Sequence, residues 1–184
     1  MLLVVAGPSG VGKGTIVRRL RELEPSLWES VSYTTRPRRP TEVDGRDYCF
    51  VTREEFEALR DAGGFLEWFE VFGDLKGTPR APVVEHLAAG DDVLLEIDVQ
   101  GALKVREQFP DAVLVFVTPP SLADLRARLE GRGTETEAAL ARRLAEAEGE
   151  LARAPEFDHV VVNDDLERVV AEVAGILSGS SSPP

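Results

Sequence analysis

The chain has 184 residues, 43% of them hydrophobic, and carries a formal net charge of −12 at pH 7. This length allows one well-packed core, and no apolar run approaches the ~20 residues of a membrane span, which excludes a protein built on transmembrane helices. The acidic balance argues against a nucleic-acid binder, and the lone Cys49 excludes a disulfide framework and predicts a reducing, cytoplasmic setting.

The first predicted elements enclose a phosphate-binding loop. Leu2–Ala6 is an apolar run that predicts a buried core strand rather than a signal peptide, and residues 12–23 have the apolar periodicity of a helix. Glycines between them let backbone N–H groups surround a polyphosphate, and a lysine adds a mobile positive charge. The predicted site for a nucleoside triphosphate consists of Gly7, Pro8, Ser9, Gly10, Val11, Gly12, Lys13, Gly14 and Thr15.

One position departs from the usual phosphate loop. The Ser or Thr that normally follows the lysine and ligates magnesium is replaced by Gly14, and Thr15 stands one place later. The strand, the turn and the helix are nevertheless in register, which favours a functional loop over a glycine-rich turn without a ligand.

The next segment predicts a mixed region that interrupts the alternation of strands and helices. Thr52 and Glu55 form a capping box at the start of an amphipathic helix. The predicted elements are strands at residues 28–32, 48–51 and 65–71, helices at 53–62 and 82–89, and a turn over 73–79.

A positive cluster lies in the polar stretch that precedes this helix. Arg36, Arg38 and Arg39 are interspersed with Pro37 and Pro40, which limit backbone freedom and favour a preorganised fork for a phosphate. Ser32 and Tyr48 could add neutral hydrogen bonds. The alternative interpretation is a solvated basic loop, which is the commoner role of such a run in isolation.

The remainder of the chain returns to alternating strands and helices. The predicted elements are strands at residues 93–98, 112–117 and 160–162 and helices at 101–109, 121–129, 137–154 and 165–177. This pattern predicts an α/β fold, a parallel sheet covered by helices on both faces, with ligands at the carboxyl ends of the strands. We expect a core of residues 1–32, 90–120 and 155–178, a mixed insertion at 33–89, an arginine-rich helical lid at 121–154 and a disordered tail at 179–184.

Three carboxylates stand in or directly after apolar strands. Glu67, Glu96 and Asp98 need partners there, because burying an unpaired carboxylate costs several kcal/mol. Guanine presents adjacent N1–H and N2–H donors that a carboxylate can accept, whereas adenine has no such pair. For Glu96, a structural ion pair or a water-mediated contact near magnesium is as open as a direct contact with the substrate.

Together these motifs resemble those of bacterial guanylate kinases over nearly the whole chain. The matching segments are residues 7–15, 31–39, 45–48, 65–68, 77–78, 97–101, 129–134 and 162–165. The resemblance implies a P-loop core with a GMP-binding region and a lid. It also implies transfer of the γ-phosphoryl group of ATP to GMP, giving ADP and GDP in purine nucleotide metabolism. Mg²⁺ would be bound with ATP, without a metal site of the protein's own.

The resemblance further implies the roles of individual residues. Lys13 and the lid arginines Arg128, Arg132 and Arg143 would meet the transferring phosphoryl group, and Asn163 would lie near the ATP base. The GMP site would consist of Ser32, Arg36, Arg39, Tyr48, Glu67, Thr78 and Asp98. The chain has Lys76 where the family often has a tyrosine that contacts GMP. The oligomeric state stays open between a monomer and a homo-oligomer.

Two alternatives stay open beside this interpretation. Another small-molecule kinase on the same scaffold, such as a ribose-bisphosphate kinase, would not need the guanine-reading Glu67 and Asp98. A non-catalytic guanylate-kinase-like interaction module would tolerate the loss of Lys13 and the lid arginines, which this chain keeps.

Overall fold

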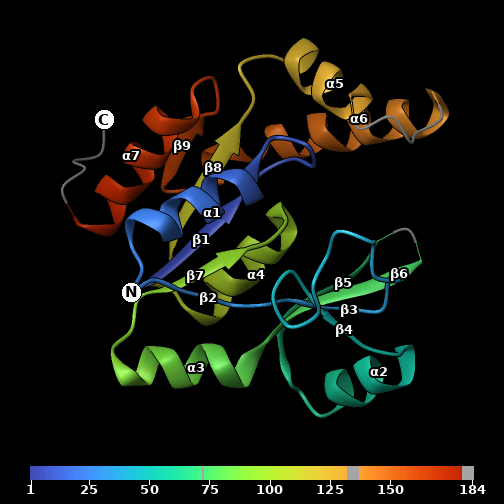
Figure 1. Cartoon of the computed structure of the whole chain (residues 1–184), viewed down its shortest axis with the longest axis vertical. Helices are drawn as coiled ribbons and strands as arrows, with labels where there is room; N and C mark the ends of the chain where they lie inside the picture. Colours follow the sequence, from blue (N-terminus) through green and yellow to red (C-terminus); the bar gives the residue numbers. More distant parts are fainter. Residues whose placement is uncertain (72, 132–136, 180–184) are drawn as a thin grey trace.

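The structure, a computed structural model, describes residues 1–71, 73–131 and 137–179. Within them, five strands form a wholly parallel sheet in the order β2-β7-β1-β8-β9 (Figure 1). These strands are β2 (Trp28–Glu29), β7 (Val93–Glu96), β1 (Leu2–Ala6), β8 (Val113–Thr118) and β9 (His159–Val162). Because the strands are parallel, their carboxyl ends meet at one edge of the sheet, where α/β proteins bind ligands.

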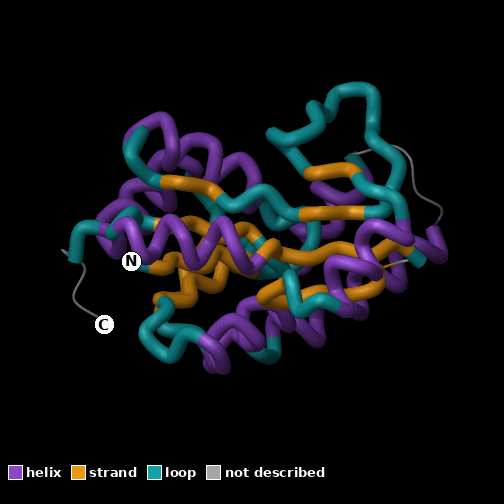
Figure 2. Tube along the Cα trace, turned by 90° about the horizontal axis from the view of Figure 1, so that it is seen from below, coloured by secondary structure: helices purple, strands orange, loops and turns teal. Residues whose placement is uncertain are grey.

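Alternating side chains of β1 enter two hydrophobic cores, one on each face of the sheet. On one face, Leu3 and Val5 pack with α1 (Lys13–Leu23) and α7 (Leu166–Leu177). On the other face, Leu2 and Val4 share a core with α3 (Arg80–Ala89) and α4 (Val99–Gln108). Figure 2 shows helices on both sides of the strands. The predicted α/β fold with helices on both faces is confirmed.

A second, mixed sheet is formed by the segment between β2 and α3. Its strand order is β4-β3-β6-β5, and its small core includes Phe56, Phe65 and Leu75. The predicted capping box is present, because Thr52 and Glu55 exchange both hydrogen bonds at the start of α2. The elements of this segment are β3 (Tyr33–Thr34), β4 (Cys49–Phe50), α2 (Arg53–Asp61), β5 (Phe65–Val71) and β6 (Asp74–Pro79).

The expectation of a turn over residues 73–79 is wrong. Gly73 takes a left-handed turn conformation with φ 87°, but Asp74–Pro79 forms β6, which pairs antiparallel with β5. A Cβ on Gly77 would come within 2.9 Å of the Glu67 carbonyl oxygen, so this glycine permits a close approach of the backbones. Pairing with β5 therefore overrides the low strand propensity of this segment.

Two helices, α5 (Leu122–Glu130) and α6 (Glu137–Leu151), form the segment predicted to be the lid. Leu125 and Leu129 pack with Leu140 and Ala147 in a core of their own. In Figure 1 this pair lies beyond the carboxyl end of β8. A short 3-10 helix, η1 (Ala154–Glu156), leads from α6 to β9.

Some expectations fall on residues that the structure does not describe. The predicted tail, apart from residue 179, and the 132–136 segment lie outside the described residues. Across the described residues, no helix combines the length and the apolar character needed to cross a membrane.

Candidate functional site

The phosphate loop leads from the carboxyl end of β1 into α1. Gly7 has φ 144°, and a Cβ there would lie 2.2 Å from the carbonyl oxygen of Val117 in β8, so the loop can pack against that strand only with glycine. Gly12, with φ 105°, is the N-cap of α1 and has no side chain to occupy the first N–H groups of the helix. The positive end of the helix dipole therefore faces the loop and can bind an anion.

Lys13 points into this loop. Its Nζ donates to the carbonyl oxygens of Gly7 at 2.5 Å and Pro8 at 3.3 Å. Burial lowers the pKa of Lys13, while the carboxylates of Glu96 and Glu150 act in the opposite direction. The ammonium group thus lies at the sheet edge among carboxylates from β7 and α6, where the phosphates of a nucleotide can replace the loop carbonyls as its partners.

The apex of the loop is tied to α5 and to the β9–α7 connection through one carbonyl group. The Val11 oxygen accepts hydrogen bonds from Arg128 Nη1 at 2.9 Å and from Asn163 Nδ2 at 2.7 Å. Arg128 Nη2 also donates to the Asn163 carbonyl oxygen at 2.8 Å. The structure therefore brings the predicted Arg128 and Asn163 to the phosphate loop, where both side chains bind protein carbonyls.

The other two predicted lid arginines are placed differently. Arg143 lies half-buried on α6, the second helix of the segment. Arg132 lies outside the described residues.

Glu67 and Asp98 lie together at the start of α4. A Cβ built on Gly101 would be 3.1 Å from Glu67 Oε2 and 3.3 Å from Asp98 Oδ1, so both carboxylates flank this glycine. Thr78 Oγ1 donates to Glu67 Oε1 at 2.5 Å, and Asp98 caps α4 by accepting from the Gly101 N–H at 2.7 Å. Three predicted GMP ligands therefore meet, and Gly101, which the sequence did not single out for this purpose, makes room for them.

The environment of Glu67 changes its titration. The side chain is buried, and this burial raises the pKa of Glu67 from 4.5 to about 7, with Thr78 lowering it and the charge of Asp98 raising it further. A buried carboxyl group beside a second carboxylate is stabilised in its ionised form by hydrogen-bond donors. The adjacent N–H groups of guanine are such donors.

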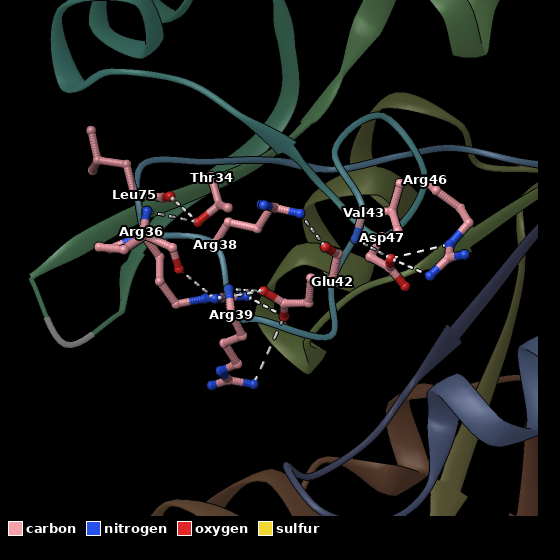
Figure 3. Close-up of polar contacts among 10 residues, drawn as sticks. Thr34, Arg36, Arg38, Arg39, Glu42, Val43, Arg46, Asp47 and Leu75 are labelled. Atoms are coloured by element: carbon pink, nitrogen blue, oxygen red, sulfur yellow. Dashed lines mark hydrogen bonds and ion pairs between the residues drawn. The ribbon is translucent and has the colours of Figure 1, made fainter.

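The arginine-rich loop is organised around a carboxylate that the sequence analysis missed (Figure 3). Arg36 donates to both oxygens of Glu42, at 2.7 and 3.0 Å, and the Arg39 backbone N–H donates to Glu42 at 2.8 Å. The Arg36 guanidinium carbon also lies 5.3 Å from the centroid of the Tyr48 ring. Glu42 stands in irregular backbone, so no periodic spacing could have linked it to Arg36.

A pocket between the two sheets holds further predicted residues. Ser32, Tyr48, Lys76 and Glu96 line it, together with Ser30. Lys76 Nζ lies 5.1 Å from the centroid of the Tyr48 ring. Burial lowers the pKa of Lys76, but the influence of Tyr48 and Glu96 outweighs it, so the net shift is upward. The lysine that departs from the family pattern is therefore a charged member of this pocket.

The surroundings of Gly14 fit a magnesium ion that arrives with a nucleotide. Within residues 1–71, 73–131 and 137–179, no group of three or more His, Cys, Asp or Glu could hold a metal. The Glu96 carboxylate oxygens lie 3.4 and 3.7 Å from the position that a Cβ on Gly14 would take. Mg²⁺ keeps several waters and binds through phosphates and one or two carboxylates, so a single carboxylate beside the loop fits such an ion.

Comparisons with known proteins show the family of the chain. The family model described as guanylate kinase matches residues 1–180. The guanylate kinase of Thermosynechococcus vestitus is 58% identical over 167 residues, which cover 91% of this chain and 87% of that protein. The guanylate kinase of Symbiobacterium thermophilum is 56% identical over 177 residues, covering 96% and 84%.

Solved structures give the same result. The crystal structure of guanylate kinase from Anaplasma phagocytophilum superposes with a TM-score of 0.82 at 36% identity, covering 97% of this chain and 85% of that one. A shikimate kinase from Bacteroides thetaiotaomicron, with a TM-score of 0.56 and 14% identity, shares the fold alone. The match over residues 1–180 and the identity with these relatives show that the chain belongs to the guanylate kinase family.

Proposed function

We propose that the chain transfers the γ-phosphoryl group of ATP to GMP through the residues described above. The observation that carries this proposal is the placement of a phosphate loop after β1 and of Asp98 after the neighbouring strand β7, with the buried Glu67 of β5 beside Asp98. A steady-state assay of ADP formation with ATP and GMP tests it. ADP formation that does not depend on GMP would overturn the proposal.

The chemistry requires positioning and charge neutralisation rather than a protein base. A phosphate monoester has a second pKa of ~6, so GMP is largely dianionic at neutral pH and its oxygen is already a nucleophile. The loop N–H groups and Lys13 would hold the donor phosphates and neutralise charge as it moves. Glu96, whose carboxylate lies beside Gly14, would help to hold Mg²⁺, which would supply positive charge for the ATP phosphates when bound.

GMP would be bound both at its base and at its phosphate end. Glu67, Thr78 and Asp98 would bind the guanine base, and Ser32, Tyr48 and the Arg36–Arg39 fork would bind the remainder of GMP. Over these sites, α5 and α6 would close as a lid that excludes water, which would otherwise compete for the phosphoryl group. The Arg128 bonds to the Val11 and Asn163 carbonyls support this role, because they already join the lid to the loop.

Replacing Arg39 with alanine should raise the KM for GMP by at least about tenfold, because a charge-assisted contact with the acceptor phosphate is lost. The Arg39 side chain is 64% exposed, so the change should have little effect on folding. Initial rates with each substrate varied in turn give both KM values. The matched control is Arg53→Ala on α2, outside this loop, and a larger effect on the KM for ATP than on that for GMP would assign the loop to the donor.

The affinity for GMP should rise with pH around neutrality. Because the pKa of Glu67 is raised to about 7 and guanine binds the ionised form, the free protein must lose a proton on binding below that pH. Affinity should therefore increase roughly tenfold from pH 6 to pH 8, relative to Glu67→Gln. Titration calorimetry at each pH measures the Kd for GMP of the unmodified chain and of Glu67→Gln. The ratio of these two Kd values also cancels the titration of the GMP phosphate, which affects both. A constant ratio would contradict the prediction.

A further inference from the structure

Glu42 contacts all three arginines of the arginine-rich loop, namely Arg36, Arg38 and Arg39 (Figure 3). Its carboxylate accepts from Arg36 Nη2 at 2.7 Å, from Arg36 Nη1 at 3.0 Å and from the Arg39 N–H at 2.8 Å. Its carbonyl oxygen accepts from Arg38 Nη1 at 2.8 Å. The Glu42 side chain is only 13% exposed, although the residues around it are largely exposed. One residue therefore fixes the conformation of a loop that has no secondary structure to hold it.

The contact leaves part of the Arg36 guanidinium available. Glu42 uses the edge formed by Nη1 and Nη2, and Nη1 also donates to the Pro37 carbonyl oxygen at 2.8 Å. The rings of Tyr48 and Phe50 lie 5.3 and 5.6 Å from Arg36 Cζ. A guanidinium group has five N–H donors in a planar fork, and over the described parts of the chain Arg36 Nε has no hydrogen bond. The Nε–Nη2 edge can therefore bind a second anion.

We propose that Glu42 is a positioning residue for the acceptor phosphate. It holds the Arg36 guanidinium by one edge so that the other edge, together with Arg39, is oriented toward the phosphate of GMP. This inference rests on the proposed GMP site and adds to it a residue that does not itself touch the substrate.

The contrary possibility is that Glu42 occupies the place of the phosphate and leaves when GMP binds. That movement would break three hydrogen bonds to the carboxylate and separate it from both arginines. The Arg36 hydrogen bond, together with that of the Arg39 N–H, lowers the pKa of Glu42, so the group would leave as a charged carboxylate. Retaining Glu42 and using the second edge of Arg36 requires none of this.

The two possibilities predict opposite signs for Glu42→Gln. A glutamine keeps the size of the side chain but cannot accept both N–H bonds of the fork, so Arg36 loses its fixed orientation. If Glu42 positions Arg36, the Kd for GMP rises by about tenfold or more, while the Kd for guanosine, which lacks the phosphate, is unchanged. The kcat at saturating GMP changes less than the KM for GMP. Tighter binding of GMP would show instead that Glu42 competes with the phosphate.

The control is Glu57→Gln on α2, whose carboxylate pairs with Arg53 at 3.5 Å and Arg60 at 3.9 Å away from the site. It should change neither Kd. An unchanged GMP Kd in Glu42→Gln, or an equal loss for guanosine, would overturn the inference, because the residue would then be dispensable or merely structural.

A structure of the unmodified chain with GMP decides the same question without a variant. The Arg36–Glu42 contact persists if Glu42 positions the arginine and is broken if it competes with the phosphate. Turnover of GMP by the unmodified enzyme is measured separately. Its absence would contradict the proposed function, whereas turnover with an unaffected Glu42→Gln would contradict only this inference.

Discussion

GMP should be phosphorylated with a kcat/KM up to ~10⁴-fold higher than that of AMP, because the acceptor site contains two carboxylates that require donors. Glu67 and Asp98 flank Gly101, and Glu67 is 5% exposed. Guanine brings N–H donors to this point, so its binding compensates for the burial of negative charge. AMP would leave the carboxylates without these donors, and an unpaired buried charge costs several kcal/mol.

Related nucleotides show which groups of the base cause the preference for GMP over AMP. We expect dGMP to be used well, because the base is unchanged, and IMP to be intermediate to poor, because it lacks the N2 amine. Initial rates of ADP formation with each nucleotide give the ratios of kcat/KM.

Variants locate the source of this preference. Glu67→Gln should reduce it, whereas Asp61→Asn, at an exposed residue of α2, should leave it unchanged. Equal kcat/KM values for GMP and AMP in the unmodified enzyme would show that Glu67 and Asp98 are structural carboxylates.

The sequence predicted the parts of the fold whose signals are local. Apolar runs predicted the parallel strands, and amphipathic spacing predicted the helices that cover them. Strand β6 was missed because its residues, Asp74–Pro79, have low strand propensity, and only pairing with β5 makes the segment extended. Helix α6 ends at Leu151 rather than at residue 154, because the chain continues into a 3-10 turn that contains Pro155.

The candidate site shows the same division between local and long-range signals. The phosphate loop and the arginine run are contiguous motifs, so their residues could be named in advance. The role of the Val11 carbonyl group could not be predicted, because its partners Arg128 and Asn163 are 117 and 152 positions away in the sequence. The role of Glu42 could not be predicted from the sequence either, since it depends on the path of an irregular loop.

Lys13→Ala should lower kcat by at least about 10²-fold while the protein remains folded. In the free protein, Lys13 Nζ binds only backbone oxygens of the loop among its described hydrogen-bond partners, namely those of Gly7 and Pro8, and water can replace it there. Position 13 is the first residue of α1, and alanine has a high helix propensity. The hydrophobic core on this face includes Val11 and Ile16 but not the lysine.

The charge is needed during phosphoryl transfer. Burial lowers the pKa of Lys13, so holding the ammonium ion in the loop carries a desolvation cost, which negative groups offset. Polyphosphate is a far stronger negative partner than a loop carbonyl, and its charge redistributes in the transition state. Removing a preorganised positive group at that point should therefore affect kcat more than the KM for GMP, whose carboxylate and arginine ligands are unchanged.

Three measurements test this assignment. The kcat is determined at saturating ATP and GMP, and circular dichroism and thermal unfolding report on the fold. The matched control is Lys104→Ala on α4, whose Nζ lies 4.0 Å from the centroid of the Phe69 ring, away from the loop. Near-normal kcat in Lys13→Ala would contradict the phosphate-loop assignment. A variant that loses its fold would show instead that the lysine stabilises the loop through its hydrogen bonds to the Gly7 and Pro8 carbonyl oxygens.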